Sequence, residues 1–378
     1  MAVRGAGSGR SDAFTPVTRP STCGPHPCIR RQPSTRRVRR IEEVSDRVHA
    51  GGMDILDRLG PGPFTYAIAR ESGVTRAQLR HLVDHGVLRR PLRGVYVASA
   101  LRDSVDLRAR AAALVVPPRG VVCDLSAAFL HGIDLLDFAS LDLLPDVEVV
   151  SAAGEPTRRN GIFGGKRTLR PEDVMSIGGV RVTTPLRTAC DVARLRGRLR
   201  AIAALDAFRR EHQVTETQLT AMLPRFKGHR GVVQLRELVP LSTDEADSQP
   251  ESWIRLMIHD ASLPMPEPQV WTLLPEWGWV RTENAYAHLR IAVEYDGEEF
   301  HTSEDDRERD ERRRKALRDA GWIVIVVRKD GFSPTARQRW MRELADAIAL
   351  RSPTAPTKRV YSRGPDHPAY RRRRTVRR

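Results

Sequence analysis

Two acidic residues in the segment IAVEYDG, Glu294 and Asp296, have the type and spacing of metal ligands. Residues two apart on a strand project from the same face, so the two carboxylates are expected to lie side by side. Like charges this close repel each other unless a cation holds them, and Mg²⁺ prefers such oxygen ligands. Bound Mg²⁺ or Mn²⁺ would activate water and neutralise a phosphodiester transition state. The chemistry that this pair suggests is hydrolysis of phosphodiester bonds.

A third carboxylate, Glu283, joins the pair if the preceding strand forms a hairpin across Ala287-His288. In that register Glu283 lies opposite Ala292 and Arg281 lies opposite Glu294, and opposed residues share a face. A three-residue loop would shift the register by one and destroy the arrangement. The prediction is an acidic cluster of these three carboxylates with Arg281 among them.

Two further residues are candidates for the same site. His301 follows Asp296 after a glycine, where it would activate water or protonate the leaving oxygen. Glu251 lies one turn before Ile254 on the apolar face of a predicted helix, within reach of the same metal. Ser248-x-x-Glu251 is also a capping box, which is a sufficient structural role for Glu251. Both interpretations of Glu251 stay open.

The elements around these residues predict a compact α/β unit over residues 246–350. After the linker STDEADSQP come a helix, strands at 269–274, 279–286 and 289–295, a charged helix at 304–320 and the strand WIVIVV. The last strand is apolar throughout, so the order αβββαβ predicts a sheet covered on both faces. Alternating charges at 305–315 are typical of a solvated helix face, and Arg313, Arg314 and Lys315 are weaker candidates for phosphate contacts.

A family resemblance is carried by three segments, ESWIRLMIHDA, VRTENAYAHLRIAVEYDGEEFH and RERDERRRKALRDAGWIVIVV. They resemble a domain allied with the very-short-patch-repair (Vsr) endonucleases of the PD-(D/E)xK restriction-endonuclease superfamily. The resemblance implies a restriction-endonuclease-like core, metal ligands at Glu251, Glu283, Glu294 and Asp296, and a catalytic His301. Asp296 replaces the lysine of the superfamily motif, which is normal for this branch. Glu283 replaces the usual aspartate, and this departure bears on catalytic competence.

Residues 53–100 predict three short helical segments, the first in MDILDRLG, followed by a hairpin. The helical segment YAIARES ends at Gly73, and Thr75-x-x-Gln78 is a capping box that begins the next helix. Gly86 ends that helix, and Val87-Leu88 and Val95–Val97 form a hairpin around the basic turn Arg89–Arg93. The order predicts a winged helix-turn-helix.

The last of these helices carries the candidate DNA contacts. Its apolar face turns Arg76, Gln78 and Arg80 outward near the helix start, where a recognition helix contacts base edges. The hairpin adds Arg89, Arg90 and Arg93 as candidate contacts. The alternative is that this unit docks on protein and its arginines are a solvated face. The segment resembles the N-terminal domain of AbiEi-type antitoxins of type IV toxin-antitoxin systems, which implies DNA binding, with autoregulation as one form of it.

Residues 101–245 predict a connector of mixed helices and strands without recognisable chemistry. Helices are expected at 104–116, 125–131, 185–195, 198–212, 215–223 and 230–239, with strands in DVEVVSA and VRVTTP. Thr184 is placed to cap a helix with Pro185 in its first turn. The phrase RVTTPLRTACDVA resembles the continuation of AbiEi-like chains from actinobacteria. His131 is interpreted as a helix-end residue, and Cys123 and Cys190 as core thiols.

The basic charge lies at the two ends of the chain. Residues 1–52 carry net +6 and residues 351–378 net +9, against +1 for the rest. With 58 Arg and 5 Lys, a GC-rich genome explains the basicity, so it is not taken as evidence for DNA binding. Both ends are expected to be disordered, the second as a phosphate-binding arm or an inert tail. One hypothesis is that the functional chain begins at Met53.

Two other features exclude whole classes of protein. Cys23, His26 and Cys28 lack the second ligand pair that a structural zinc site needs. The apolar runs are too short to cross a membrane and no secretory signal follows Met1, so a cytoplasmic protein is expected.

The leading hypothesis is an α/β multidomain protein that binds double-stranded DNA through its winged helix and cuts it with a Mg²⁺-dependent endonuclease domain. The first alternative is a non-enzymatic AbiEi-like antitoxin or transcriptional regulator with a degenerate nuclease fold, whose partner is a toxin or another regulatory protein. The second is a protein-interaction module whose acidic cluster binds nothing.

Overall fold

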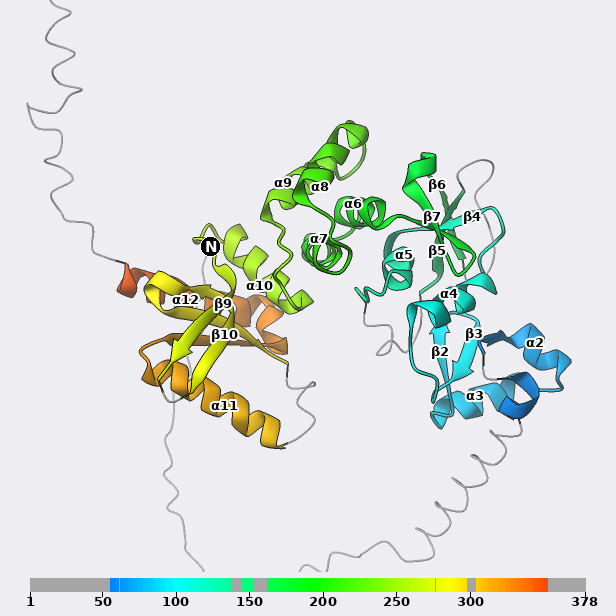
Figure 1. Ribbon diagram of the computed structural model, residues 1–378, viewed down its shortest axis with the longest axis horizontal. Coiled ribbons are helices and arrows are strands. Elements are labelled where there is room, and N and C mark those ends of the chain that lie inside the picture. Colours follow the sequence, from blue (N-terminus) through cyan, green and yellow to red (C-terminus); the bar gives the residue numbers. More distant parts are fainter. Residues whose placement is uncertain are drawn as a thin grey trace, which may run out of the picture. The chain divides into compact units, whose positions relative to one another are not determined.

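A computed structural model describes residues 55–60, 62–136, 145–151, 162–275, 277–297 and 304–352 (Figure 1). The chain divides into two units, Met1–Gly51 and Gly52–Arg378, and the described residues all belong to the second. The predictions for residues 1–52, for the cysteines at 23 and 28, for Met53, for His301 and for the tail beyond 352 lie outside the described residues. Within the described ranges, none of the helices is long and apolar enough to cross a membrane.

The first group of elements follows the predicted order of three helical segments and a hairpin, and residues 55–59 form the first helical segment. It comprises β1 (Phe64–Thr65), α2 (Tyr66–Glu71), α3 (Arg76–Asp84), β2 (Leu88–Leu92) and β3 (Val95–Ala98), with the sheet order β1-β3-β2. Gly73 supplies the turn between the helices with φ +79°. The capping box at Thr75 is confirmed, because its hydroxyl accepts from Gln78 N and Gln78 Oε1 accepts from Thr75 N.

The hairpin differs from the prediction at its tip. Strand β2 runs through Arg89 and Arg90 to Leu92, which pairs with Val95, so the turn is only Arg93-Gly94. The predicted five-residue basic turn was wrong because a two-residue turn with a glycine at φ +81° closes the hairpin. Arg89 and Arg90 therefore lie next to each other on β2, and Arg93 lies in the turn.

The middle of the chain begins with a five-stranded sheet of order β6-β5-β4-β8-β7. Its strands are β4 (Gly120–Val122), β5 (Val147–Ser151), β6 (Ile162–Lys166), β7 (Val174–Ile177) and β8 (Val180–Thr183), and helices α4 (Val105–Ala113) and α5 (Asp124–Leu130) pack against it. The strands predicted in DVEVVSA and VRVTTP are confirmed as β5 and β8. Cys123 is a buried free thiol, as predicted, and so is Cys190 in the helices that follow.

Four helices follow this sheet. They are α6 (Pro185–Leu195), α7 (Arg198–His212), α8 (Glu216–Met222) and α9 (Val232–Leu238), and they enclose an apolar core around Leu205 and Phe208. Thr184 caps α6 with Pro185 in the first turn, as predicted. Helix α9 begins two residues later than predicted, because Gly231 adopts φ +77°.

The last group of elements confirms the predicted αβββαβ order and adds a final helix. It comprises α10 (Gln249–Asp260), β9 (Glu267–Leu274), β10 (Gly278–Tyr286), β11 (Ile291–Asp296), α11 (Glu304–Asp319), β12 (Ile323–Arg328) and α12 (Pro334–Arg351). The sheet order is β12-β11-β10-β9, with β11 and β12 parallel. Side chains of α10 and α12 pack on one face of the sheet, and Leu317 of α11 packs on the other.

The predicted register of β10 and β11 was wrong by two residues. Ala285 pairs with Ala292 and Tyr286 with Ile291, so continuing this register sets Glu283 opposite Glu294. Arg281 does not lie opposite Glu294. The reason is a longer connection than the Ala287-His288 turn, since residues 287–289 form a 3₁₀ turn and residue 290 adopts φ +51°. A shift of two residues preserves which residues share a face, and Glu294 and Asp296 remain two apart on β11.

Candidate functional sites

A groove with basic and aromatic side chains lies between α2, α3 and the hairpin. This α3 groove has a volume of about 390 Å³ and is lined by Tyr66, Arg76, Arg80, Val83, Asp84, Arg90, Gly94 and Tyr96. Leu79 and Leu82 form the buried face of α3. Arg76 and Arg80 therefore face outward, as the sequence predicted. Arg76 lies over the Tyr66 ring, 4.6 Å from its centroid. The groove thus presents positive charge next to two aromatic rings.

The other candidate DNA contacts have different surroundings. Gln78 is exposed, and its carbonyl oxygen is used in the capping box. Arg89 donates to Leu101 O at 3.1 Å, and Arg93 donates to Asp146 at 2.5 Å. Arg281, which was predicted within the acidic cluster and is a further candidate DNA contact, donates to Asp247 at 2.5 Å and lies over the Trp271 ring. Of the hairpin arginines, only Arg90 lines the α3 groove.

The predicted metal ligands Glu294 and Asp296 lie side by side, and both are paired with arginines of α11. Both carboxylate oxygens of Glu294, whose side chain is 1% exposed, accept from Arg313 at 2.8 Å. Asp296 accepts from Arg314 at 3.0 Å and lies 3.6 Å from Arg328. Guanidinium groups therefore supply the positive charge that the sequence predicts from a divalent cation.

Glu283 and Glu251 complete the carboxyl groups of this region. Glu283 is partly buried and accepts from Tyr295 N at 2.7 Å. Burial and the nearby negative charges of Glu251 and Glu294 raise the pKa of Glu283 to about 8. Glu251 accepts from Asp247 N at 3.0 Å and from Gln269 Nε2 at 2.6 Å, and burial raises its pKa as well. The Ser248 hydroxyl accepts from Glu251 N, which is one half of the predicted capping box, whereas the backbone group that the Glu251 carboxylate binds is Asp247 N.

A divalent metal does not fit this arrangement of side chains. Among the described residues, no three His, Cys, Asp or Glu side chains come together as a metal-binding group. Glu294 has both oxygens occupied by one bidentate arginine, which is the strongest geometry for that pair. A metal bound to Glu294 would share its oxygens with Arg313, whose positive charge opposes a divalent cation.

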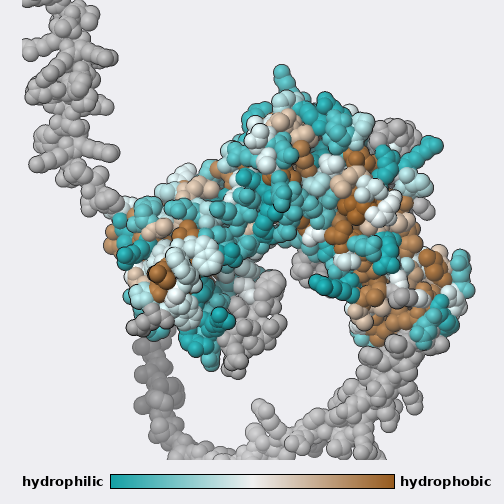
Figure 2. All heavy atoms as spheres, viewed as in Figure 1, coloured by the Kyte–Doolittle hydropathy of each residue, from teal (hydrophilic) through white to brown (hydrophobic). Residues whose placement is uncertain are grey.

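A cleft lies beside these carboxyl groups. This C-terminal cleft has a volume of about 930 Å³; residues 132–135 and helix α7 line one side, and residues 246–253, β10, β11 and α11 line the other. Glu251 and Glu283 both line it. The surface over α11 is strongly hydrophilic (Figure 2), yet Arg314 of this helix is buried against the cleft.

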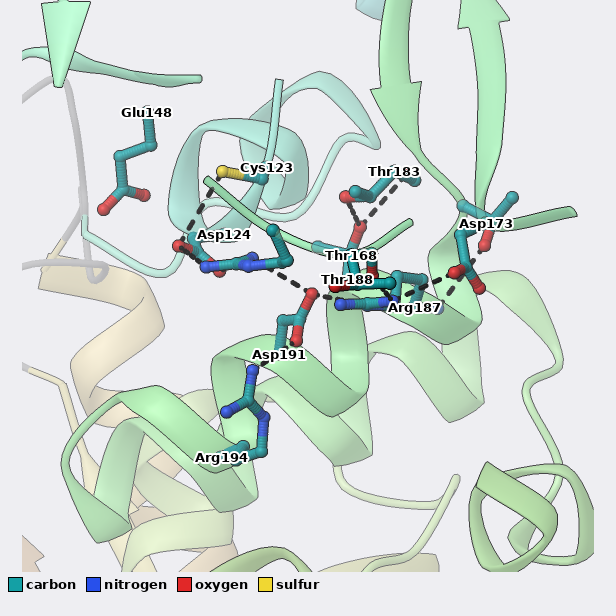
Figure 3. Close-up of polar contacts among 12 residues, drawn as sticks. Cys123, Asp124, Glu148, Thr168, Asp173, Thr183, Arg187, Thr188, Asp191 and Arg194 are labelled. Carbon is teal, nitrogen blue, oxygen red and sulfur yellow. Dashed lines mark hydrogen bonds and ion pairs between the residues drawn. The ribbon is translucent and has the colours of Figure 1, made fainter. Parts of the chain in front are cut away.

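A buried charge network in the middle of the chain was not found by sequence reasoning (Figure 3). Asp191 has no exposed surface and accepts from Arg187 Nε at 2.7 Å, and from Arg167 and Arg194 at 3.0 Å each. Arg167 also forms a two-pronged pair with Asp124, at 2.8 and 3.0 Å. The network joins the five-stranded sheet to helix α6.

Further pairs extend this network toward α8. Asp173 accepts from Arg187 at 2.9 Å, and both of its oxygens are contacted by Arg225. The Arg187-x₃-Asp191-x₂-Arg194 spacing on one helix was a local signal for such a cluster. Its remaining partners are distant in the sequence.

Two candidate reactive residues near this network are held inert. The Cys123 thiol donates to Asp124 at 3.8 Å, and burial raises its pKa well above the usual value, which disfavours the nucleophilic thiolate. His131 follows the last residue of α5 and lies 2.7 Å from Thr183 O through Nε2. Burial lowers its pKa to about 4. The prediction of a helix-end histidine is confirmed.

Two known families match the first group of elements and the elements from β4 to α9. Residues 53–99 match the family "Transcriptional regulator, AbiEi antitoxin", and residues 120–241 match the family "AbiEi antitoxin C-terminal domain". The protein is therefore an α/β multidomain protein with AbiEi antitoxin-type domains. These matches end before the elements that carry Glu251, Glu283, Glu294 and Asp296.

Two relatives from Mycobacterium tuberculosis extend the comparison. They are the uncharacterized proteins MT2308, of strain CDC 1551 / Oshkosh, and Rv2248, of strain ATCC 25618 / H37Rv. Each is 33% identical over 259 residues, covering 67% of this chain and 90% of the relative. The chain belongs to the family of these two proteins.

Proposed function

We propose that this protein is a DNA-binding regulator of the AbiEi antitoxin type, and that α2, α3 and the β2–β3 hairpin form a winged helix-turn-helix. The observation that carries the proposal is the α3 groove, where Arg76 and Arg80 of α3 meet Arg90 of the hairpin. In such a unit the recognition helix enters the major groove and the wing contacts the phosphate backbone. The match to a transcriptional-regulator family supports this assignment.

The surroundings of the candidate arginines divide them into two groups in this proposal. Arg76, Arg80 and Arg90 are the direct contacts, because they line one groove. Arg89 and Arg93 have protein partners that fix the hairpin, so their role is to position it. Residues 53–100 are the DNA-binding unit, residues 101–245 are the connector, and the compartment is the cytoplasm. By analogy with the antitoxin family, a toxin or another regulatory protein is the second partner.

The test is DNA binding measured against salt concentration. Fluorescence anisotropy with duplex DNA from the chain's own upstream region would compare the wild type with an Arg76→Ala/Arg80→Ala variant. If both arginines contact phosphates, the slope of log K against log salt falls by about 1.8. The control variant is Arg110→Ala/Arg236→Ala, which removes two exposed arginines outside the groove. Equal binding by the wild type and the Arg76/Arg80 variant would refute the assignment.

A second candidate function is metal-dependent cleavage of DNA by a Vsr-like domain at residues 246–350. It is favoured by the nearness of Glu283 to Glu251 and Glu294, whose negative charges raise the pKa of Glu283. The arginine pairs on Glu294 and Asp296 count against it, since the guanidinium groups already neutralise these carboxylates and repel a divalent cation. Plasmid nicking with Mg²⁺ or Mn²⁺ tests it. Cleavage that is lost in Glu294→Ala supports a nuclease, and no cleavage by the wild type supports the non-enzymatic regulator.

A further inference from the structure

The β9–β10 hairpin carries a cluster of exposed apolar side chains. Trp271, Leu273 and Trp279 are 60%, 61% and 65% exposed, and Trp277 lies between the two strands and is 37% exposed. Trp271 pairs with Arg281 and Leu273 pairs with Trp279, so these side chains share one face of the sheet. Single exposed apolar residues are ordinary on a protein surface, whereas several on one hairpin mark a contact surface.

Strand β9 lies at the edge of its sheet (Figure 1). The strand order is β12-β11-β10-β9, and among the described residues β9 pairs with β10 alone. Val270 and Leu274 contribute their side chains to the apolar core under α11. The backbone groups of β9 that point away from β10 therefore have no strand partner in the described part of the chain. An edge of this kind can pair with a strand of another molecule.

The sequence of this edge is suited to pairing with a copy of itself. Residues 269–274 (QVWTLL) contain no charge, no proline and no glycine, and they include β-branched and aromatic residues, which is the pattern of self-pairing segments. A second copy therefore brings no like charge against this strand. A nucleic acid fits less well, because Arg281, the one basic residue within 267–286, is paired with Asp247.

One antiparallel register of two β9 strands is self-complementary. Gln269 adopts φ +51°, which interrupts the extended backbone, so the regular stretch is residues 270–274 and its centre is Thr272. A two-fold axis at Thr272 sets Trp271 opposite Leu273 of the second copy and Thr272 opposite its own equivalent. Both apolar pairs then lie on the exposed face, next to Trp279 of each copy.

The exposed area is that of a weak dimer. A tryptophan presents about 150–250 Å², so the exposed fractions of Trp271 and Trp279 amount to roughly 200–300 Å² per copy. This is about a third of the roughly 800 Å² that each partner buries in a standard interface. Leu273 and the paired strand backbones add to it. A small interface is therefore expected, with a dissociation constant on the order of micromolar to tens of micromolar.

We propose that two copies of this chain form a two-fold dimer by antiparallel pairing of their β9 strands. The pairing joins two four-stranded sheets into one sheet of eight strands. Because the contact is two-fold and each copy contributes the same edge, it closes at the dimer. A dimer carries two copies of the α3 groove, as proteins that bind paired DNA half-sites do. The dimer goes beyond the proposed regulatory function and does not depend on DNA binding by residues 53–100.

The first test is sedimentation equilibrium of the full-length protein without DNA, at roughly 1–100 µM. The wild type is expected to show a monomer–dimer equilibrium. Leu273→Lys places a charge opposite Trp271 of the second copy and is expected to raise the dissociation constant at least about tenfold. Circular dichroism verifies that the variant is folded.

Phe163→Lys is the matched control. It makes the same kind of change on β6, an edge strand of the five-stranded sheet, where Phe163 is 67% exposed but is followed by two glycines and a lysine. This variant should dimerise like the wild type. A wild type that stays monomeric over the whole range, or a dimer that Leu273→Lys does not weaken, would overturn the proposal. A dimer that Phe163→Lys dissociates as strongly as Leu273→Lys would also overturn it.

The second test examines the register by disulfide cross-linking. In a Cys23→Ser/Cys28→Ser background, where the other two thiols are buried, Thr272→Cys places one thiol on each side of the axis. The two Cα atoms are then about 4.5–5.5 Å apart, which a disulfide spans, and mild oxidation should yield a covalent dimer. Trp279→Cys is the control, since three strand spacings, about 14 Å, separate its two copies. Cross-linking of Thr272→Cys no faster than that of Trp279→Cys would contradict pairing through β9.

Discussion

Replacing Asp191 by asparagine is expected to destabilise the protein strongly while preserving its shape. The carboxylate has no exposed surface and accepts charged hydrogen bonds from Arg167, Arg187 and Arg194. Asparagine has nearly the same size, but it is neutral and its amide nitrogen would face guanidinium donors. Two of the arginines keep another carboxylate, at Asp124 and Asp173 respectively. Arg194 loses its only salt bridge among the described residues.

The magnitude follows from these partners. Three hydrogen bonds to a charged group are worth about 1.5–3 kcal/mol each, which sets an upper limit of about 9 kcal/mol. Because two arginines remain paired, the lower cost of breaking one buried pair applies, about 3–5 kcal/mol. Adding Arg194→Met to the variant removes the unpaired cation, so the double variant should recover part of this loss.

The assay is urea unfolding followed by far-ultraviolet circular dichroism at neutral pH. Asp106→Asn is the control, since Asp106 and Arg110 form an exposed pair on α4 with side chains 72% and 52% exposed. That control is expected to cost less than about 1 kcal/mol. A loss in Asp191→Asn no larger than the loss in Asp106→Asn would show that the buried network does not hold α6 to the sheet.

Three other changes test separate parts of the structure. His131, whose pKa is lowered to about 4 by burial, binds its proton more weakly in the folded protein than in the unfolded chain, where its pKa is about 6.5. Stability is therefore lost as pH falls from about 6.5 to 4, by at most about 1.4 kcal/mol per pH unit, and a His131→Phe variant measured over this range should lack that loss. Gly231→Ala should cost several kcal/mol more than Gly228→Ala in thermal unfolding, because both have φ +77° but only the first would place a Cβ 1.8 Å from a backbone oxygen; equal costs would contradict the close approach. Glu294→Gln should lower the free energy of unfolding by about 3–5 kcal/mol, since it leaves Arg313 without its bidentate partner, and a loss below about 1 kcal/mol would mean that this pair is not formed in solution.

Local hydrogen bonding explains which features could be predicted from the sequence. The caps at Thr75, Thr184, Thr215 and Ser248 were recognisable because the side chain and the backbone groups it satisfies lie within three residues of one another. The order of helices and strands in residues 246–350 followed from apolar patterning in the same way.

The β10–β11 register could not be predicted because it depends on the connection between the strands. A two-residue turn was the simplest hypothesis, but residues 287–289 form a 3₁₀ turn and Arg290 adopts a left-handed conformation that its residue type does not announce. The prediction kept the correct faces only because the shift was an even number of residues. An odd shift would have separated Glu283 from Glu294.

The sequence did not predict which arginines pair with the buried carboxylates. The alternating charges of α11 are typical of a solvated face. Arg313 and Arg314 of this helix nevertheless donate hydrogen bonds to Glu294 and Asp296 of β11. The pairing depends on how α11 packs, which no spacing along the helix determines. The same holds for Arg167, which joins Asp191 from another element.

The four carboxyl groups that were predicted as candidates for one site therefore divide into two pairs with different partners. Glu294 and Asp296 face guanidinium groups that neutralise them, so their contribution is to fix α11 on the sheet. Glu251 and Glu283 line the C-terminal cleft without a cationic partner among the described residues. A ligand that supplies hydrogen-bond donors interacts favourably with the second pair and gains little from the first. Ligand binding in the C-terminal cleft should therefore be more sensitive to Glu283→Gln than to a change in the Glu294–Arg313 pair that preserves folding, whereas a metal-dependent nuclease would require both Glu283 and Glu294.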